Sequence, residues 1–337
     1  MKKNKVLIIR FSSFGDIVQC SSVVDVLTRE AVVHWATRDD FRSLVELNKN
    51  LEKVYSLDKK LGFFGLIKFA LLLRSEKYTH VYDAHNNLRS KIILLFLRMS
   101  LNFPKTLTRS KDRFKRILLF KFRVNLFPSP FRGIDSYLNP LLKWGVNISP
   151  KYPLVTWHFQ ETTQTKVNEI LEKVLKDSPF IALAPSAAWE MKRWPLEYWK
   201  QVIELMTDHK FVIFGGKDDV FCEDLVTGHE NRVYNFAGKL SLTESSLLIK
   251  NAKLVISGDT GLLHVADVLS VKGLSLMGPT AFGFTCGPQI KTVEVELSCR
   301  PCSKDGRGKC SQDVYKKCMV DIHPQRVCAE ATALIRD

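Results

Sequence analysis

Short apolar runs alternate with longer amphipathic segments along the first half of the chain. Continuous apolar runs of this kind are typical of buried parallel strands, and they fall at residues 6–10, 31–36, 54–57 and 79–83. Segments with apolar residues at helical spacing follow them, at residues 16–28, 39–47, 63–74 and 88–99. Strands separated by helices predict right-handed βαβ units and a parallel sheet.

The pattern breaks near Asn147, where turn-forming residues cluster as far as Pro153, and a polar helix is then expected at residues 161–176. Further strands are predicted at residues 180–184, 210–214, 233–236, 254–257 and 271–277, with helices at 195–206, 218–227, 242–251 and 262–269. We therefore predict an α/β protein with two Rossmann-like domains, whose parallel sheets face a central cleft. The predicted boundaries are 1–150 for the N-terminal domain, 151–178 for a linker and 179–337 for the C-terminal domain.

The composition is that of a soluble globular protein, since 45% of the 337 residues are hydrophobic and 25% are charged. No segment approaches the roughly 18 uninterrupted apolar residues of a membrane span. The apolar run behind the N-terminal lysines is too short for a signal peptide. We therefore expect a cytoplasmic protein.

The net charge of +15 is concentrated in one region, because nine Lys and Arg residues stand against Asp112 alone between Arg98 and Arg123. Such a stretch favours a polyanion, which could be a nucleic acid, an anionic membrane face or a phosphorylated glycolipid. The apolar residues 117–120 within it favour a membrane-leaning element. A solvated basic face without a partner is the remaining interpretation.

The segment that follows the predicted strand 254–257 is the strongest candidate for a phosphate site. A polar turn with Gly258 and Gly261 lies between a strand and a helix, which places free N–H groups at the positive end of a helix dipole. Either Asp259 or Thr260 is expected to cap this helix, and His264 follows about one turn later.

Two further turns are expected on the same edge of the C-terminal sheet. One follows strand 180–184 and carries the cations Lys192 and Arg193, which suit a diphosphate. The other contains Gly215 and Gly216, which let a nucleotide approach the backbone, and Asp218 or Asp219 is then a candidate acceptor for ribose hydroxyls. Three such turns together predict a nucleotide diphosphate site.

The first strand of the chain leads into a small turn, residues 12–15, that presents Asp16 at a helix N-terminus. This carboxylate either stabilises the helix dipole or acts as a general base. Neither the glycine pattern of dinucleotide-binding folds nor a P-loop occurs in the chain.

Several of these segments, in this order, resemble glycosyltransferase family 9, the heptosyltransferases of lipopolysaccharide core synthesis. The matching motifs are Arg10-Phe-Ser-Ser-Phe-Gly-Asp16, Pro185-Ser-Ala-Ala-Trp189 with Lys192-Arg-Trp-Pro195, Ser257-Gly-Asp-Thr-Gly261 with His264, and Met277-Gly-Pro-Thr280. The resemblance implies a GT-B fold with an ADP-heptose donor in the C-terminal domain. It also implies a lipid A–Kdo or heptosylated core acceptor on the N-terminal domain.

The resemblance also implies roles for individual residues. Asp16 matches the catalytic base of this inverting family, and Lys192 matches the lysine that neutralises the departing diphosphate. Asp219 stands where the family often has a longer Glu at the nucleotide. The resemblance also implies donor roles for Asp259, Thr260, Gly261 and His264, and the turns described above add Arg193, Gly215 and Gly216 to the predicted donor residues. The acceptor residues that we expect are Ser13, Gly15, Arg89, Arg113 and Arg116. No cofactor is expected, because cations and a helix dipole can stabilise the leaving diphosphate.

Four cysteines crowd into one short segment, Cys299, Cys302, Cys310 and Cys318. A tetrahedral thiolate zinc site is conceivable, but only the first two have the usual C-x-x-C spacing. Reduced thiols with a structural role and disulfides are the alternatives, and we assign no metal to this cluster.

The sequence thus predicts a glycosyltransferase that moves heptose from ADP-heptose to the inner core of lipopolysaccharide. It would act as a peripheral protein at the inner face of the cytoplasmic membrane and would not bind nucleic acid. A family 9 transferase with another nucleotide sugar or a protein acceptor is one alternative. A basic nucleic-acid-binding protein and a sugar-binding module without activity are the others.

Overall fold

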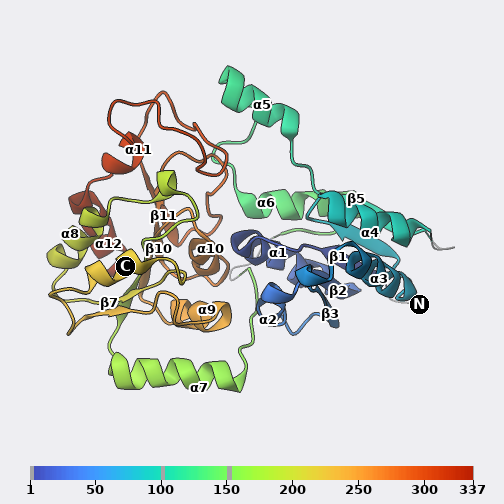
Figure 1. The fold of residues 1–337 in the computed structure, drawn as a ribbon, viewed down its shortest axis with the longest axis horizontal. Helices are drawn as coiled ribbons and strands as arrows, with labels where there is room; N and C mark the ends of the chain where they lie inside the picture. The colour runs from blue at the N-terminus through green and yellow to red at the C-terminus, as the bar shows by residue number, and fades with distance from the viewer. Residues whose placement is uncertain (1–3, 100–102, 150–153, 337) are drawn as a thin grey trace. The chain divides into compact units, whose positions relative to one another are not determined.

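A computed structural model describes residues 4–99, 103–149 and 154–336 of the chain (Figure 1). The chain divides into two compact units. Unit 1 comprises Met1–Asp112 and Ile134–His158, and unit 2 comprises Arg113–Gly133 and Phe159–Asp337. Each unit is built on one parallel sheet.

Unit 1 has a five-stranded sheet in the order β3-β2-β1-β4-β5. The strands are β1 (Asn4–Ile9), β2 (Ala31–Arg38), β3 (Lys53–Leu57), β4 (His80–Asp83) and β5 (Lys105–Thr108). The helices are α1 (Phe14–Leu27), η1 (Asp39–Phe41), α2 (Arg42–Val45), η2 (Lys59–Leu61), α3 (Gly62–Ser75), α4 (Leu88–Arg98), α6 (Gly133–Leu138) and η3 (Asn139–Trp144). Side chains of α3 and α4 pack together on one face of the sheet, with Phe69 and Ile93 against Leu7 and Ile9.

Unit 2 has a six-stranded sheet in the order β11-β10-β9-β6-β7-β8. The strands are β6 (Phe180–Ala184), β7 (Lys210–Ile213), β8 (Val233–Asn235), β9 (Leu254–Gly258), β10 (Gly273–Met277) and β11 (Ile290–Glu294). The helices are α5 (Arg113–Phe122), α7 (Glu161–Glu169), η4 (Ile170–Val174), η5 (Glu190–Lys192), α8 (Leu196–Leu205), η6 (Val220–Leu225), α9 (Leu242–Lys250), α10 (Gly261–Val268), α11 (Lys317–Val320) and α12 (Pro324–Arg336). Trp199 of α8 and Val327 of α12 pack with Leu183 and Ile256 in its core.

The predicted α/β class is confirmed, because both sheets are parallel and all nine predicted strands are present. The pattern did not reveal the edge strands β5 and β11, nor helices α5, α6 and α12. Both edge strands consist mostly of polar residues and only part of each is buried, so they lack the continuous apolar run of a central strand. The helix predicted at 39–47 is shorter, since it consists of η1 and α2.

The two units differ from the predicted domains in two places. Residues 113–133, expected in the N-terminal domain, group with unit 2, where the rings of Phe127 and Phe131 pack on Phe282. The polar helix of the expected linker is α7, which belongs to unit 2 and pairs Lys166 with Glu244 at 2.9 Å. The first residues of that linker, as far as Pro153, lie outside the described residues.

Within the described ranges, no helix has the length and apolar character needed to span a bilayer.

Candidate active-site residues of the two units

Asp16 lies at the carboxyl end of β1, in the first turn of α1. Its carboxylate pairs with the Arg10 guanidinium at 2.5 Å and accepts a hydrogen bond from the Tyr137 hydroxyl at 2.7 Å. Ser13 also donates to it, from its hydroxyl at 2.9 Å and from its backbone N–H at 3.3 Å. The side chain of Asp16 nevertheless keeps 36% of its surface exposed, so it is accessible from solvent.

These partners decide the charge of Asp16. Burial on its own raises the pKa of this carboxyl, but the Arg10 guanidinium and the Tyr137 hydroxyl outweigh it. The pKa of Asp16 therefore lies well below its ordinary value, and the group is ionised at neutral pH. A carboxylate so stabilised accepts a proton readily only from an oxygen that is already becoming acidic.

Two residues near Asp16 were not among the site residues predicted from the sequence. Tyr137 stands on α6, and its ring lies 4.0 Å from the guanidinium carbon of Arg109. Arg109 also donates to Ser136 Oγ at 3.0 and 2.6 Å, which holds the guanidinium on the tyrosine ring. Tyr137 and Arg109 are more than ninety residues from Asp16 along the chain, so no local pattern could associate them with it.

Arg89 lines a cavity of about 270 Å³ in unit 1, at the carboxyl edge of the sheet. Phe63, Leu66 and Ile92 are among its apolar walls, and the cations Arg38, Lys59 and Arg89 also line it. The combination of apolar walls and cations suits an amphiphile with an anionic group.

The other two predicted acceptor cations, Arg113 and Arg116, are not in unit 1. Both stand on α5, which groups with unit 2. The Arg116 guanidinium lies 4.5 Å from the centre of the Phe282 ring, in cation–π geometry. The acceptor role that we expected for this pair therefore involves a helix of unit 2.

The three predicted donor turns of unit 2 follow β6, β7 and β9, which are neighbours in the sheet. Because the strands are parallel, the turns share one edge. Lys192 ends η5 after β6, Gly215 follows β7, and Asp259 follows β9.

Lys192 and Asp259 form the centre of this edge. The Lys192 ammonium lies 2.9 Å from the Asp259 carboxylate, and both side chains are largely buried. Thr280 donates its hydroxyl to the same carboxylate at 2.9 Å, and His264 Nε2 lies 3.9 Å from it. Burial raises the pKa of Asp259, but Lys192 and His264 outweigh that effect and lower it.

The helix cap that the sequence left open is Thr260. Its hydroxyl accepts a hydrogen bond from the backbone N–H of Leu263, and α10 begins at Gly261. Asp259 is therefore free to pair with Lys192 beside the positive end of α10, where an anion is favoured.

Asp219, which the sequence predicts to contact ribose hydroxyls, has several partners within the protein. Its carboxylate accepts hydrogen bonds from Ser186 Oγ and from the Gly216 N–H, both at 2.6 Å, and Arg193 lies 3.6 Å away. These contacts engage both oxygens of the carboxylate. Asp219 thus organises the glycine turn and the basic loop.

The four clustered cysteines are free thiols. Burial raises the pKa of Cys302, and it raises that of Cys318 to about 11, so both are protonated at neutral pH. Among the described residues, no group of three or more His, Cys, Asp or Glu side chains has the geometry to hold a metal ion.

Comparison with known proteins gives a consistent result. The family model of glycosyltransferase family 9 (heptosyltransferase) matches residues 66–316. The lipooligosaccharide heptosyltransferase 2 of Haemophilus ducreyi is 25% identical to the chain over 355 aligned positions, which cover 98% of this chain and 99% of that protein.

Two solved structures are similar over almost the whole chain. The family 9 glycosyl transferase of Veillonella parvula has a TM-score of 0.80 at 20% identity, covering 100% of this chain and 99% of that one. The ADP-heptose lps heptosyltransferase II of Escherichia coli has a TM-score of 0.72 at 20% identity, covering 98% of each chain. This likeness confirms the predicted GT-B fold.

Proposed function

The chain belongs to glycosyltransferase family 9, and we propose that it moves L-glycero-D-manno-heptose from ADP-heptose to the inner core of lipopolysaccharide with inversion. The observation that carries the proposal is the Lys192–Asp259 pair beside the N-terminus of α10, at an edge that also presents the Gly215–Gly216 turn. This edge combines a cation, a helix dipole and a close backbone approach, which are the features that a sugar nucleotide needs.

Lys192 and the α10 N-terminus bind the diphosphate in this proposal. When the donor binds, the Lys192 ammonium exchanges part of its contact with Asp259 for a phosphate oxygen. The Asp259 carboxylate then accepts hydrogen bonds from hydroxyls of the sugar. As the bond from the anomeric carbon to the diphosphate breaks, Lys192 and the helix dipole stabilise the developing charge on ADP.

Asp16 accepts the proton of the acceptor hydroxyl. The acceptor oxygen attacks the anomeric carbon from the face opposite the diphosphate, so a new glycosidic bond forms as the old bond breaks. The hydroxyl becomes acidic only as it bonds to carbon, and at that stage the ionised Asp16 carboxylate takes the proton.

The cavity of unit 1 that contains Arg89 supports a phosphorylated glycolipid as acceptor. Its cations suit the phosphate or carboxylate groups of such a lipid, and its apolar walls suit the lipid part.

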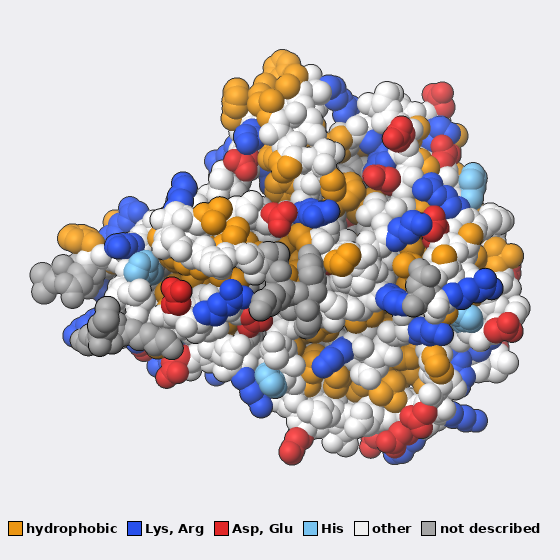
Figure 2. Space-filling view, turned by 180° about the vertical axis from the view of Figure 1, so that it is seen from behind, with side chains coloured by type: hydrophobic (Ala, Val, Ile, Leu, Met, Phe, Trp, Pro, Cys, Tyr) orange, Lys and Arg blue, Asp and Glu red, His pale blue; other side chains and the backbone are white. Residues whose placement is uncertain are grey.

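A membrane surface is the place of action that we propose. Helix α5 has Leu119 buried, whereas Phe114, Ile117 and Phe122 are exposed by 71%, 53% and 58%. Apolar and basic side chains occur together at the top of the view in Figure 2, where α5 lies. An amphipathic basic helix of this kind favours the interface of an anionic bilayer.

A transfer assay tests the proposed reaction. The protein is incubated with ADP-heptose and with lipopolysaccharides truncated at graded lengths of the inner core, and the product is identified by mass spectrometry. We expect transfer to one truncated acceptor, and we expect Asp16→Asn to lower kcat by about 10²–10⁴-fold, the range for loss of a general base.

Parallel reactions with UDP-sugars and GDP-sugars provide the control for the donor. Transfer from one of these in place of ADP-heptose would contradict the proposed donor. Full activity in both Asp16→Asn and Lys192→Ala would contradict the proposed chemistry.

A further inference from the structure

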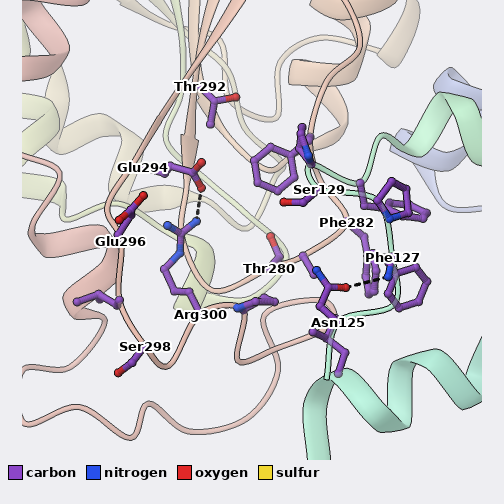
Figure 3. A pocket seen from close by; sticks show the side chains of 18 residues that line it. Asn125, Phe127, Ser129, Thr280, Phe282, Thr292, Glu294, Glu296, Ser298 and Arg300 are labelled. Atoms are coloured by element: carbon purple, nitrogen blue, oxygen red, sulfur yellow. Dashed lines mark hydrogen bonds and ion pairs between the residues drawn. The ribbon is translucent and has the colours of Figure 1, made fainter. Parts of the chain in front are cut away.

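A cavity of about 640 Å³ lies in unit 2, beyond the ends of β10 and β11 (Figure 3). This volume is within the range of about 300–1,000 Å³ that is typical of small-molecule sites. The donor residues proposed above are not among the described residues that line it. Thr280 connects the two places, because it lines the cavity and donates its hydroxyl to Asp259 at 2.9 Å.

One wall of the cavity is aromatic. The ring of Phe282 lies edge to face with Phe127 and Phe131, at centroid distances of 5.1 and 5.0 Å, and Phe127 and Phe131 are 5.5 Å apart. Such contacts hold the rings in fixed orientations. The wall therefore offers a preformed apolar surface of the kind on which the C–H face of a sugar ring packs.

The opposite side is polar and acidic. In Figure 3 the side chains of Glu294, Glu296 and Arg300 lie on the left of the view, and Phe127 and Phe282 lie on the right. Thr292 also lines the cavity, from the half-buried side of β11. Carboxylates and threonine hydroxyls can both accept hydrogen bonds from sugar hydroxyls.

The guanidinium of Arg300 is engaged in contacts within the protein. It pairs with Glu294 at 2.6 Å and donates to the carbonyl oxygens of Gly278, at 2.8 Å, and of Val295. Arg300 is the one cation among the described residues that line the cavity, so with it paired Glu296 carries the remaining charge of the lining. Arg116 and Arg123 stand beside the wall, where they contact the Phe282 ring and the Pro301 carbonyl oxygen. This lining offers no unpaired cation to a phosphate or carboxylate group, whereas its carboxylates and hydroxyls suit neutral hydroxyl donors.

We infer that this cavity is a subsite for an uncharged sugar ring. The inference rests on the proposed function, which supplies two sources for such a ring. One is the heptose of the donor, whose diphosphate lies near Asp259. The other is a neutral sugar of the acceptor core. The phosphorylated part of either substrate lies outside the cavity.

Two conservative variants test the subsite in the transfer reaction. Glu296→Gln removes the charge of an exposed carboxylate, and Thr292→Val removes one hydroxyl without a change of size. Glu204→Gln, at an exposed position of α8, is the matched control. We expect Glu296→Gln to raise one KM on the order of tenfold, as for a weakened hydrogen bond to a charged group. We expect Thr292→Val to raise the same KM by a smaller factor, as for the loss of a neutral hydrogen bond, and kcat to stay nearly unchanged in both variants.

The KM that changes identifies the source of the sugar. A higher KM for ADP-heptose assigns the cavity to the donor sugar, and a higher KM for the truncated acceptor assigns it to the core. Unchanged values of both constants in both variants would overturn the inference.

A binding measurement separates this inference from the proposed function. Saturation-transfer NMR records the binding of free heptose and of mannose 6-phosphate to the intact protein. We expect heptose to bind, to bind more weakly to Glu296→Gln than to Glu204→Gln, and to bind more tightly than the phosphorylated sugar. If that pattern appears in a protein that transfers no heptose, the proposed function fails and the subsite stands. If heptose binds equally to all variants, the subsite is wrong whatever the transfer assay shows.

Discussion

The position of Asp16 in the fold can be predicted from the sequence, but the groups that surround its carboxylate cannot. Its place at the end of a strand and in the first turn of a helix follows from the local pattern, and the structure has it there. Its partners Tyr137 and Arg109 come from a distant part of the chain, and they contribute to its ionisation. The buried Arg10 was part of the quoted motif, but only the ion pair shows that it acts on the carboxylate.

A variant of Arg10 should change the pH dependence of transfer. In the native protein the pKa of Asp16 is depressed below the ordinary value of about 4. The carboxylate is therefore still ionised at about pH 4, where an ordinary Asp would be half protonated. Arg10→Gln removes the cation that favours the charged form, so the pKa rises and the acid limb of the kcat/KM profile moves to higher pH. Arg10→Lys retains the charge and should keep the limb close to its native place. An identical profile for all three folded proteins would show that Arg10 does not act on Asp16.

The same ion pair should affect stability. Because the folded-state pKa of Asp16 is lowered, its contribution to the free energy of unfolding is present above about pH 4 and is lost as pH falls through the folded value.

At the scale of elements, the segment around the four cysteines contributes to the proposed donor site through its backbone. Gly306 has a φ of +91°, and a Cβ placed there would lie 2.6 Å from Cγ of Lys192. Ser303 holds this turn, since its hydroxyl accepts from the Gly306 N–H at 2.9 Å. The cysteines drew attention in the sequence, but a glycine makes the close approach to Lys192.

Gly306→Ala should therefore displace Lys192 and weaken ADP binding. Gly308 is the matched control, because it also has a positive φ, +114°, but a Cβ there meets nothing within 4 Å. Both alanines strain the backbone by about 1–3 kcal/mol, but only the first disturbs the lysine. Calorimetry should show a Kd for ADP that is at least about tenfold higher for Gly306→Ala than for Gly308→Ala. Equal affinities would show that the segment does not position Lys192.

At the scale of the whole molecule, the net charge of +15 raises the question of whether membrane attraction is general or local to α5. Two double variants change the net charge equally. One combines Arg113→Glu with Lys121→Glu, both on α5, and the other combines Lys173→Glu with Lys253→Glu, neither of which is on α5. Each cation near an anionic surface contributes about 1 kcal/mol, so reversal on α5 should weaken binding at least about tenfold.

Flotation with vesicles of phosphatidylglycerol and phosphatidylcholine measures this difference. Binding of the native protein should fall between about 0.1 M and about 1 M salt, as the Debye length falls from about 10 Å to about 3 Å. Pure phosphatidylcholine vesicles are the control for the lipid. An equal loss in both double variants would assign the attraction to net charge, and binding that neither variant changes would remove the proposed role of α5.

The sequence by itself determined the elements and the edges at which chemistry can occur. Continuous apolar runs mark central strands because both faces of a parallel sheet are covered, and glycine, threonine and aspartate mark the turns at strand ends. These local rules located β1, β6, β7 and β9 and the turns that follow them.

Only the tertiary structure decided which groups meet. Lys192 pairs with Asp259 rather than standing free, Thr260 rather than Asp259 caps α10, and Asp219 binds its own loop. Helix α5 joins unit 2 through aromatic contacts with Phe282, which no short-range pattern encodes. The physical reason is that periodicity records how each segment meets its nearest neighbours, whereas ion pairs, pKa values and cavities depend on segments that only folding brings together.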